Sequence, residues 1–264
     1  MQVATLPTNP ADVRQLIRAD ELIQPTAGIA PGHIQANLAI LPRDAAFDFL
    51  LFCQRNPRPC PLLEVIEAGD TEPKIFAPGA DIRTDIAKYR VFEHGEMTAE
   101  VSDIRDYWRD DLVSFLLGCS FSFESALITA GIEMRHIEKC INVSMFITNI
   151  ETSPAGEFSG PMVVSMRPIP REQIVRAVQV TSRFPAVHGA PVHIGDPTAI
   201  GISDVTKPDL GDPAEFKDGE VPVFWACGVT PQAVAMNSKP PLMITHSPGY
   251  MFVTDKQDED MAVI

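Results

Sequence analysis

Apolar residues recur at helical spacing in several stretches of the chain, and these stretches predict helices. The first stretch follows Asn9 and Pro10, a capping residue and a proline suited to the first helical turn. The longest runs from Ser102 or Asp103 to Leu117, with Trp108, Leu112 and Phe115 among the residues on its apolar face. The predicted helices begin near residue 10 and cover 44–54, 103–117, 124–130, 170–183 and a short segment from 230.

Short apolar runs bounded by glycine or proline predict strands. They cover residues 62–66, 89–92, 143–150, 162–166, 221–227, 243–246 and 251–254. The last two are expected to pair with each other about Pro248 and Gly249. Because helices and strands alternate unevenly, the sequence predicts an α/β (mixed α and β) fold, with a mixed sheet and flanking helices. No flexible linker divides the chain, so we expect one globular unit over 1–264. Two tightly packed subdomains split near residue 100 or 140 are the alternative.

The segment His188–Pro197 breaks this regular pattern. It holds two histidines, an aspartate, two glycines and two prolines within ten residues. Glycine and proline shape individual backbone angles, so the segment predicts a loop around one short strand. Such loops often carry active-site groups, although a structural turn with histidines bonded to backbone carbonyls would have the same composition.

Composition narrows the class of protein. The 264 residues carry 21 Lys and Arg against 35 Asp and Glu, a net charge of −14. Such an acidic surface repels phosphate groups, so we expect no nucleic-acid and no membrane partner, whereas one arginine-lined pocket could still bind a small anion. Five cysteines without a CxxC pair predict a reduced, cytoplasmic protein, and Met1–Pro7 shows no export signal. A homo-oligomer is compatible with all of this.

Several polar residues stand at expected ends of strands or helices. Arg167 follows a strand and could bind a carboxylate with two parallel hydrogen bonds, although a surface arginine is the plainer interpretation. Ser120 and Ser122 precede a helix, where hydroxyl and N–H groups favour anions, and either could cap it. Glu124 would lie in the first turn of that helix, as a general base or merely as a favourable charge against the helix dipole.

Thiols and imidazoles complete the set of candidates. A helix start would lower the pKa of Cys119, and Cys227 has a similar setting between a strand and a helix. Histidine titrates near neutral pH, so His188, His193 and His246 suit proton transfer, with His136 as a further candidate. His188 and His193 with Asp196 and His246 could form a metal site, but nothing in their spacing selects a metal, so we expect no cofactor.

Five longer strings share their residues with one known family. They are Gly118–Glu124, Val163–Pro168, His188–Pro197, Pro222–Gln232 and Ile244–Gly249. Shorter matches lie in the first half, at Gln35–Asn37, Arg55–Pro57 and Cys60–Pro61. On these strings the chain resembles the D-glutamate cyclase family, whose bacterial members are usually called hydro-lyases.

The resemblance implies a mixed α/β fold, a small anionic carboxylate as substrate, and lyase chemistry that removes water. For the cyclase itself, this chemistry closes D-glutamate to 5-oxo-D-proline. The alternatives are a hydro-lyase acting on another small hydroxy acid and a non-catalytic protein that binds carboxylates or senses redox state through Cys119 and Cys227.

Ring closure needs a proton acceptor, a proton donor and hydrogen-bond donors for the tetrahedral oxyanion. We expect Arg167 to bind the α-carboxylate and the segment around Ser120 and Ser122 to supply donors. Glu124, His188 or His193 would move the protons, with Asp196 orienting an imidazole. Cys119, Cys227 and His246 are expected to line the substrate site as well.

Overall fold

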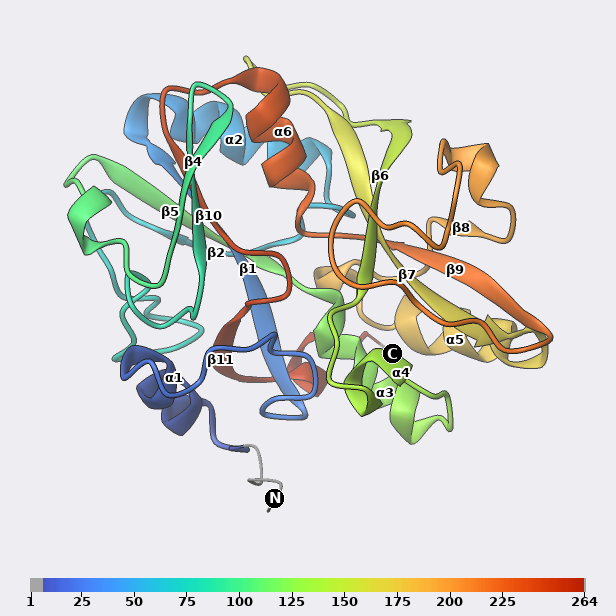
Figure 1. Ribbon diagram of the computed structural model, residues 1–264. Helices are drawn as coiled ribbons and strands as arrows, with labels where there is room; N and C mark the ends of the chain where they lie inside the picture. The colour runs from blue at the N-terminus through green and yellow to red at the C-terminus, as the bar shows by residue number, and fades with distance from the viewer. Residues whose placement is uncertain (1–6, 264) are drawn as a thin grey trace.

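Two antiparallel sheets form the centre of the molecule (Figure 1). The structure is a computed structural model that describes residues 7–263. Residues 1–6, in which we expected no export signal, lie outside the described part of the chain. The first sheet has the order β2-β5-β1-β10-β3-β4, and β11 lies beside β1. Its strands are β1 (His33–Pro42), β2 (Leu62–Ile66), β3 (Tyr89–Glu93), β4 (Glu96–Val101), β5 (Leu112–Gly118), β10 (Met243–His246) and β11 (Phe252–Gln257).

The second sheet has the order β6-β7-β9-β8 and is inserted in the chain between β5 and β10. Its strands are β6 (Ser144–Glu151), β7 (Pro161–Pro170), β8 (His193–Ile194) and β9 (Glu220–Ala226). The α/β fold class is therefore confirmed. In place of one mixed sheet, the described residues form two sheets whose strand pairings are antiparallel.

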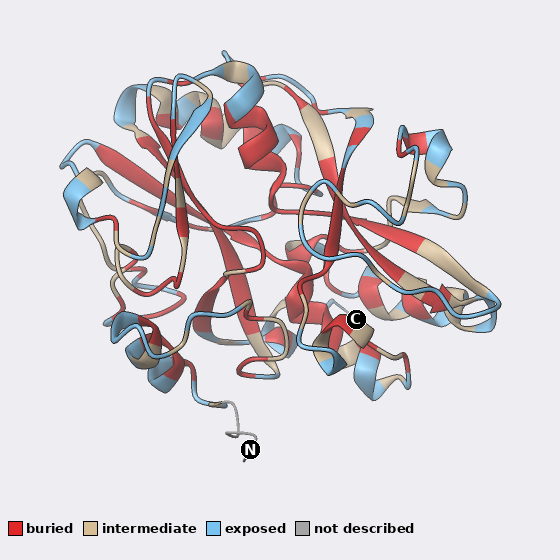
Figure 2. Cartoon of the chain, viewed as in Figure 1, coloured by how far each residue is buried: buried red, intermediate tan, exposed pale blue. Residues whose placement is uncertain are grey.

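Helices cover both sheets. They are α1 (Pro10–Arg18), α2 (Arg43–Arg55), α3 (Glu124–Thr129), α4 (Arg135–Glu138), α5 (Ile174–Ser182) and α6 (Thr230–Ser238). Helices α2 and α6 pack on one face of the first sheet through Phe49, Phe52 and Val234. Helices α3 and α5 cover a face of the second sheet around Trp225. Figure 2 shows the resulting burial, which is densest along the central strands of each sheet.

The helix predicted over 103–117 is wrong. A short 3-10 turn occupies Arg105–Tyr107, and Leu112–Gly118 is the central strand β5, in which every residue is buried. A strand covered on both faces loses the alternation of polar and apolar residues, so its sequence cannot be told from a buried helix by periodicity. The largely exposed strand β4 was not predicted, although Glu96–Val101 alternates polar and apolar residues and packs Ala99 and Val101 against the core.

The strands β10 and β11 exist as predicted but do not pair with each other. Strand β10 pairs with Ala39 and Ile40, whereas β11 pairs with the preceding part of β1, from His33 to Ala36. Strands β10 and β11 therefore lie one after the other along the same edge of β1, the edge opposite β5, and the turn at Pro248 and Gly249 connects them.

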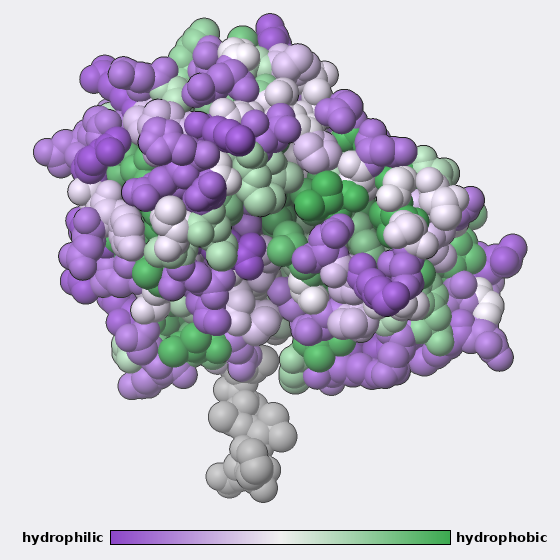
Figure 3. Space-filling view, turned by 45° about the horizontal axis from the view of Figure 1, so that its top comes forward, coloured by the Kyte–Doolittle hydropathy of each residue, from purple (hydrophilic) through white to green (hydrophobic). Residues whose placement is uncertain are grey.

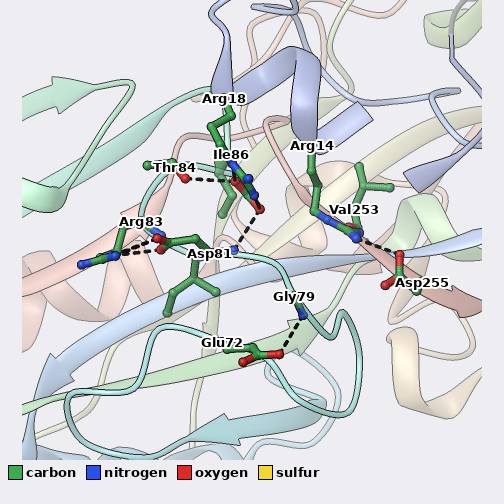
Figure 4. Close-up of polar contacts among 12 residues, drawn as sticks. Arg14, Arg18, Glu72, Gly79, Asp81, Arg83, Thr84, Ile86, Val253 and Asp255 are labelled. Atoms are coloured by element: carbon green, nitrogen blue, oxygen red, sulfur yellow. Dashed lines mark hydrogen bonds and ion pairs between the residues drawn. The ribbon is translucent and has the colours of Figure 1, made fainter. Parts of the chain in front are cut away.

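The first helix begins as predicted and is fixed to the first sheet by two arginines. Asn9 caps α1 by accepting a hydrogen bond from the N–H of Ala11. Figure 4 shows Arg14 and Arg18 extending from α1 towards neighbouring segments. Arg14 donates to the carbonyl of Val253 (2.8 Å), and Arg18 binds both carboxylate oxygens of the fully buried Asp85 at 2.8 and 2.6 Å.

Polar side chains dominate the face drawn in Figure 3, in keeping with the net charge of −14, while apolar ones gather near its middle. Within residues 7–263, no helix combines the length and the hydropathy needed to cross a bilayer.

We predict that Asp85→Ala destabilises the protein by about 2–3 kcal/mol, because it leaves the Asp81 N–H without its acceptor and Arg18 without its counterion. The matched control is Asp111→Ala, which removes an ion pair with Arg109 in which both side chains are half exposed. That pair contributes about 0–1 kcal/mol. Urea unfolding of both variants measures the difference; equal losses would contradict this account of Asp85.

Candidate active site

A buried network of charged side chains joins α3, α4 and β7. Oε1 of Glu124 lies 2.9 Å from Nε and 2.5 Å from Nη2 of Arg167, and 3.0 Å from Nε2 of His136. Arg167 also donates to the hydroxyls of Ser165 and Ser120, both at 3.0 Å. Glu124 and Arg167 are 1% and 2% exposed, so water does not compete for these bonds.

The local sequence explains how this network is placed. Strand β5 ends at Gly118, where a Cβ atom would lie 2.1 Å from the carbonyl oxygen of Ala186. Only glycine permits that close approach. The chain then turns through a 3-10 segment, Ser120–Phe123, directly into α3, so that Ser120 and Glu124 lie one turn apart. Strand β7 presents Ser165 and Arg167 on one face because they are two residues apart.

Aromatic rings cover the guanidinium of Arg167. Its central carbon lies 5.6 Å from the ring centre of Phe123 and 5.4 Å from that of Trp225. Cation–π contacts of this kind stabilise a buried cation most when water is excluded. The rings therefore hold the arginine in place while its hydrogen bonds fix the carboxylate.

The electrostatics of the network keep Glu124 ionised. Burial alone would raise the pKa of Glu124, but the charges of His136 and Arg167 and their hydrogen bonds outweigh that effect and hold the pKa below its ordinary value. All of these contacts engage Oε1, and Oε2 has no hydrogen-bond partner. Glu124 is therefore charged at neutral pH, and its free oxygen can accept a hydrogen bond.

Two pockets adjoin the network on different sides. One, of about 130 Å³, is lined by Gly28–His33, Gln35, Glu124, Ser125 and Asp258 together with apolar residues. The other, of about 50 Å³, lies beyond His136 and Arg167 and is bounded by α4 and residues 212–215. Glu124 is one of the residues in the wall of the first pocket, which is therefore the candidate substrate site.

The predicted caps at Ser120 and Ser122 are wrong, since α3 has no side-chain cap. Ser120 instead bonds Arg167, and the hydroxyl of Ser122 accepts a hydrogen bond from the N–H of Gln35 in β1 (3.1 Å). Both serines are buried, and both tie the segment before α3 to neighbouring strands.

The expected lowering of the Cys119 pKa is also wrong. Sγ of Cys119 accepts a hydrogen bond from the N–H of Phe121, but burial dominates and raises the pKa well above its ordinary value. Burial likewise raises the pKa of Cys227 to about 11. The two thiols lie beside the network and pack in one apolar cluster, so they act as packing groups.

His188 and His246 are buried and neutral. Nδ1 of His188 donates to the carbonyl of Arg58 (2.6 Å), which leaves Nε2 as an acceptor with no partner, and burial lowers the pKa of this histidine to about 4. Nδ1 of His246 accepts from the N–H of Leu38 (3.1 Å), and burial lowers its pKa to about 4 as well. Arg167 lies near enough to His188 to contribute to its low pKa.

His193 and Asp196 lie apart from the network. In the antiparallel register His193 faces Phe224, whereas Arg167 faces Val223. Consecutive residues of a strand point to opposite faces, so His193 and Arg167 lie on opposite faces of the second sheet. The expectation that Asp196 orients an imidazole fails too. Its exposed carboxylate caps the N–H of Thr198 (3.0 Å), and Nε2 of His193 donates instead to the backbone carbonyl of Asp196 (2.7 Å).

Several residues of the pocket and the network went unrecognised in the sequence, among them Ser125, Ser165 and Asp258, and one was only a secondary candidate. Ser165 sits inside a strand motif, and Asp258 lies in the tail that looked solvated, yet it is only 5% exposed. His136, a secondary candidate, directly contacts Glu124. No pattern in the sequence pointed to Asp258, because its burial depends on the 3-10 turn Asp258–Met261 folding back against Gly32.

A metal site from the predicted histidines is not assembled. Within residues 7–263, no three or more His, Cys, Asp or Glu side chains converge closely enough to hold a metal ion. His188, His193, Asp196 and His246 are separated between the two sheets as described above.

Thiol labelling provides a direct test of the cysteine environments. We predict that an alkylating reagent at pH 7 modifies Cys140, which is exposed, and leaves the buried Cys119 and Cys227 unmodified in the folded protein. Mass spectrometry counts the labels, and Cys140→Ser is the control that removes the single fast reaction. Rapid labelling of Cys119 in that variant would contradict a raised thiol pKa.

Acid should weaken the fold through the buried histidines. A folded-state pKa of about 4 against an ordinary 6.5 means that His188 and His246 contribute stability above pH 6.5 and lose it as the pH falls from 6.5 to 4. His188→Asn suits the left-handed backbone of this residue (φ 85°) and does not titrate. We expect it to reduce the loss of unfolding free energy between pH 7 and pH 5. An unchanged pH dependence in urea unfolding would contradict the role of His188.

Comparison with known proteins places these features in a family. Residues 113–255 match the family model described as D-glutamate cyclase. A protein from Thermoanaerobacter sp. is 68% identical over 96% of each chain, and one from Psychrobacter arcticus is 64% identical over 97% of each chain. A Bacillus subtilis protein is 64% identical over 97% of this chain and 99% of its own. All three are named "Putative hydro-lyase".

The family match covers β5 to β11, so it includes Glu124, His136 and Arg167, and the relatives extend the similarity over nearly the whole chain. The resemblance found in the sequence motifs is thereby confirmed. This chain is a lyase of the hydro-lyase class, and it belongs to the D-glutamate cyclase family.

Proposed function

We propose that this hydro-lyase closes D-glutamate to 5-oxo-D-proline and that Glu124 accepts the proton of the substrate amine. The observation that carries the proposal is the free Oε2 of Glu124, a residue of the pocket wall, while Oε1 accepts hydrogen bonds from Arg167 and lies 3.0 Å from Nε2 of His136. The family description supports D-glutamate as the substrate.

The reaction balances without a further reactant. The substrate enters with an ammonium group and a distal carboxylate, and its nitrogen forms a bond to the carboxylate carbon. Two of the three ammonium protons leave with one carboxylate oxygen as water, and the third stays on the ring nitrogen. A single carboxylate that accepts a proton and then returns it to the departing oxygen can serve both transfers.

Each neighbour of Glu124 has a role in this scheme. Arg167 makes four hydrogen bonds within the protein, so it positions Glu124 and does not bind the α-carboxylate as the sequence suggested. His136 shares that task from α4. Ser125 lines the pocket, and its hydroxyl oxygen accepts from the N–H of Gly32 (3.1 Å), which leaves its own proton for a substrate carboxylate.

Confinement supplies the rest of the catalysis. Bending the substrate so that its amine faces its distal carboxylate is the chief entropic cost of ring closure, and a shaped pocket removes that cost in advance. Another small amino acid or hydroxy acid of similar size fits the same chemistry, so the identity of the substrate is the part of the proposal to test first. Redox sensing by Cys119 and Cys227 has less support, because both thiols are buried and their pKa values are raised.

We predict that the purified protein converts D-glutamate with the loss of one water, as measured by mass spectrometry. Glu124→Gln keeps the shape of the side chain and removes the base, so we expect kcat to fall by about 10²–10⁴-fold. His193→Ala, on the opposite face of the second sheet, should leave kcat unchanged. Circular dichroism checks that both variants fold.

The outcomes separate the substrate from the mechanism. Loss of water from a hydroxy acid but not from D-glutamate would replace the proposed substrate. Full activity of Glu124→Gln, or inactivity of a folded His193→Ala, would overturn the assignment of Glu124 as the base.

A further inference from the structure

His33 in the wall of one pocket of about 130 Å³ has an unpartnered Nδ1, and three other residues of that wall have side-chain oxygen atoms without hydrogen-bond partners. They are Oε1 of Gln35, Oε2 of Glu124 and Oδ1 of Asp258. The three side chains are 3%, 1% and 5% exposed, and they come from β1, α3 and the 3-10 turn after β11. Buried acceptors normally find donors, so unpartnered acceptors on three residues of one pocket wall favour a ligand that donates hydrogen bonds.

The orientation of Gln35 is fixed by its own contacts. Its amide nitrogen donates to the backbone carbonyls of Thr26 (2.9 Å) and Ile29 (3.0 Å). Only the nitrogen of a primary amide can donate, so Oε1 must be the free atom, and it is an acceptor. The loop of residues 26–29 thus fixes the orientation of the Gln35 amide and with it the position of Oε1.

Asp258 is held by its backbone while its carboxyl group stays free. Its N–H donates to the carbonyl of Gly32 (2.9 Å), which closes the 3-10 turn against the start of β1. Burial, reinforced by the charges of Glu259 and Glu124, raises the pKa of Asp258 to about 8, so the empty pocket holds this group protonated at neutral pH. A cation in the pocket would relieve both the burial of charge and the repulsion.

We propose that this pocket binds the ammonium group of the substrate, with Gln35, Glu124 and Asp258 accepting its three N–H donors. A primary ammonium has three donors and no acceptor, which matches the three acceptor residues in the wall of this pocket. The proposal deepens the proposed function by naming the amine subsite and adds Asp258 as a catalytic residue. It places Oε2 of Glu124 against the proton that must leave before ring closure.

The surroundings of the subsite suit an amino acid. Next to it lies a wider pocket of about 480 Å³, which shares Gly32, His33, Ser125 and Asp258 with the inner one and is lined by Arg176 and Arg183. Arg183 is ion-paired with Glu259 in the same wall (3.4 Å), so Arg176 attracts a carboxylate at the entrance, while the inner acceptors select the amine. A substrate is thus oriented with its positive end inward.

The test compares two ligands that differ only in the amine. D-2-aminopentanoate carries the ammonium but lacks a distal carboxylate, so it cannot cyclise, and pentanoate lacks the ammonium as well. Calorimetry should show that the wild-type protein binds the amine-bearing ligand at least about tenfold more tightly, a free-energy difference of about 1.4 kcal/mol. Asp258→Asn should lose most of that preference. Glu93→Gln removes an exposed charge on β3, outside both pockets, and should keep it.

A second measurement needs no variant. If the bound ammonium ionises Asp258, the wild-type protein releases protons on binding the amine ligand near pH 7 and none on binding pentanoate. Titration in buffers of different ionisation enthalpy counts them. The charged and titratable groups around Asp258 are Glu124 from α3, His33 from β1, Glu259 and Asp260 from its own turn, and Arg176 and Arg183 from α5 and the residue after it. The buffer comparison in Asp258→Asn separates their contribution from that of Asp258.

Failure of the subsite and failure of the proposed function give different results. An amine preference that persists in Asp258→Asn, or the absence of any preference in the wild type, overturns the subsite even if D-glutamate is converted. A preference that Asp258→Asn abolishes, in a protein that does not convert D-glutamate, supports the subsite and rejects the cyclase reaction. Thermal unfolding of each variant confirms that loss of binding is not loss of fold.

Discussion

The ion pair between Glu124 and Arg167 is the interaction on which the site depends. Both groups are almost entirely buried, so neither can exchange its partner for water, and removal of one would leave an uncompensated charge. The ion pair also gives the two oxygens of the Glu124 carboxylate different roles. One oxygen accepts hydrogen bonds from Arg167 and lies 3.0 Å from Nε2 of His136, while the other has no partner. The fold thus holds one carboxylate oxygen of Glu124 firmly and leaves the other without a partner.

Both sheets contribute to that arrangement, and close backbone approaches bring them together. The absence of a side chain at Gly118 lets the end of β5 approach the backbone of Ala186. A Cβ atom at Gly228 would strike the side chain of Asn37, whose amide nitrogen donates to the carbonyl of Gly118 (2.6 Å). Strand β1 of the first sheet therefore meets the end of β5 and the segment after β9 at the same place. The position of Glu124 follows from these contacts as much as from its own bonds.

The sequence predicted local features well and spatial relations poorly. Asn9 with Pro10 and the isolated run Leu62–Ile66 carry their signals in neighbouring residues, so the helix and the strand form where expected. Glu124 and Arg167 were recognised from their places at a helix start and a strand end. The separation of His193 from Arg167, in contrast, depends on strand register, which composition does not reveal. Asp258 is the extreme case, because its burial depends on the distant segment around Gly32.

The strand partners of β1 become available late, because the protein is made from its N-terminus. Its neighbours β10 and β11 are synthesised far later, and the bond between Leu38 and His246 spans 208 residues. One side of β1 therefore lacks its partners through most of translation, a state prone to pairing with other chains and one that slows folding. The pocket beside Glu124 is equally incomplete until Asp258 has emerged from the ribosome. A nascent chain thus has its charged network before it has a finished pocket, and activity arrives only with the last strands.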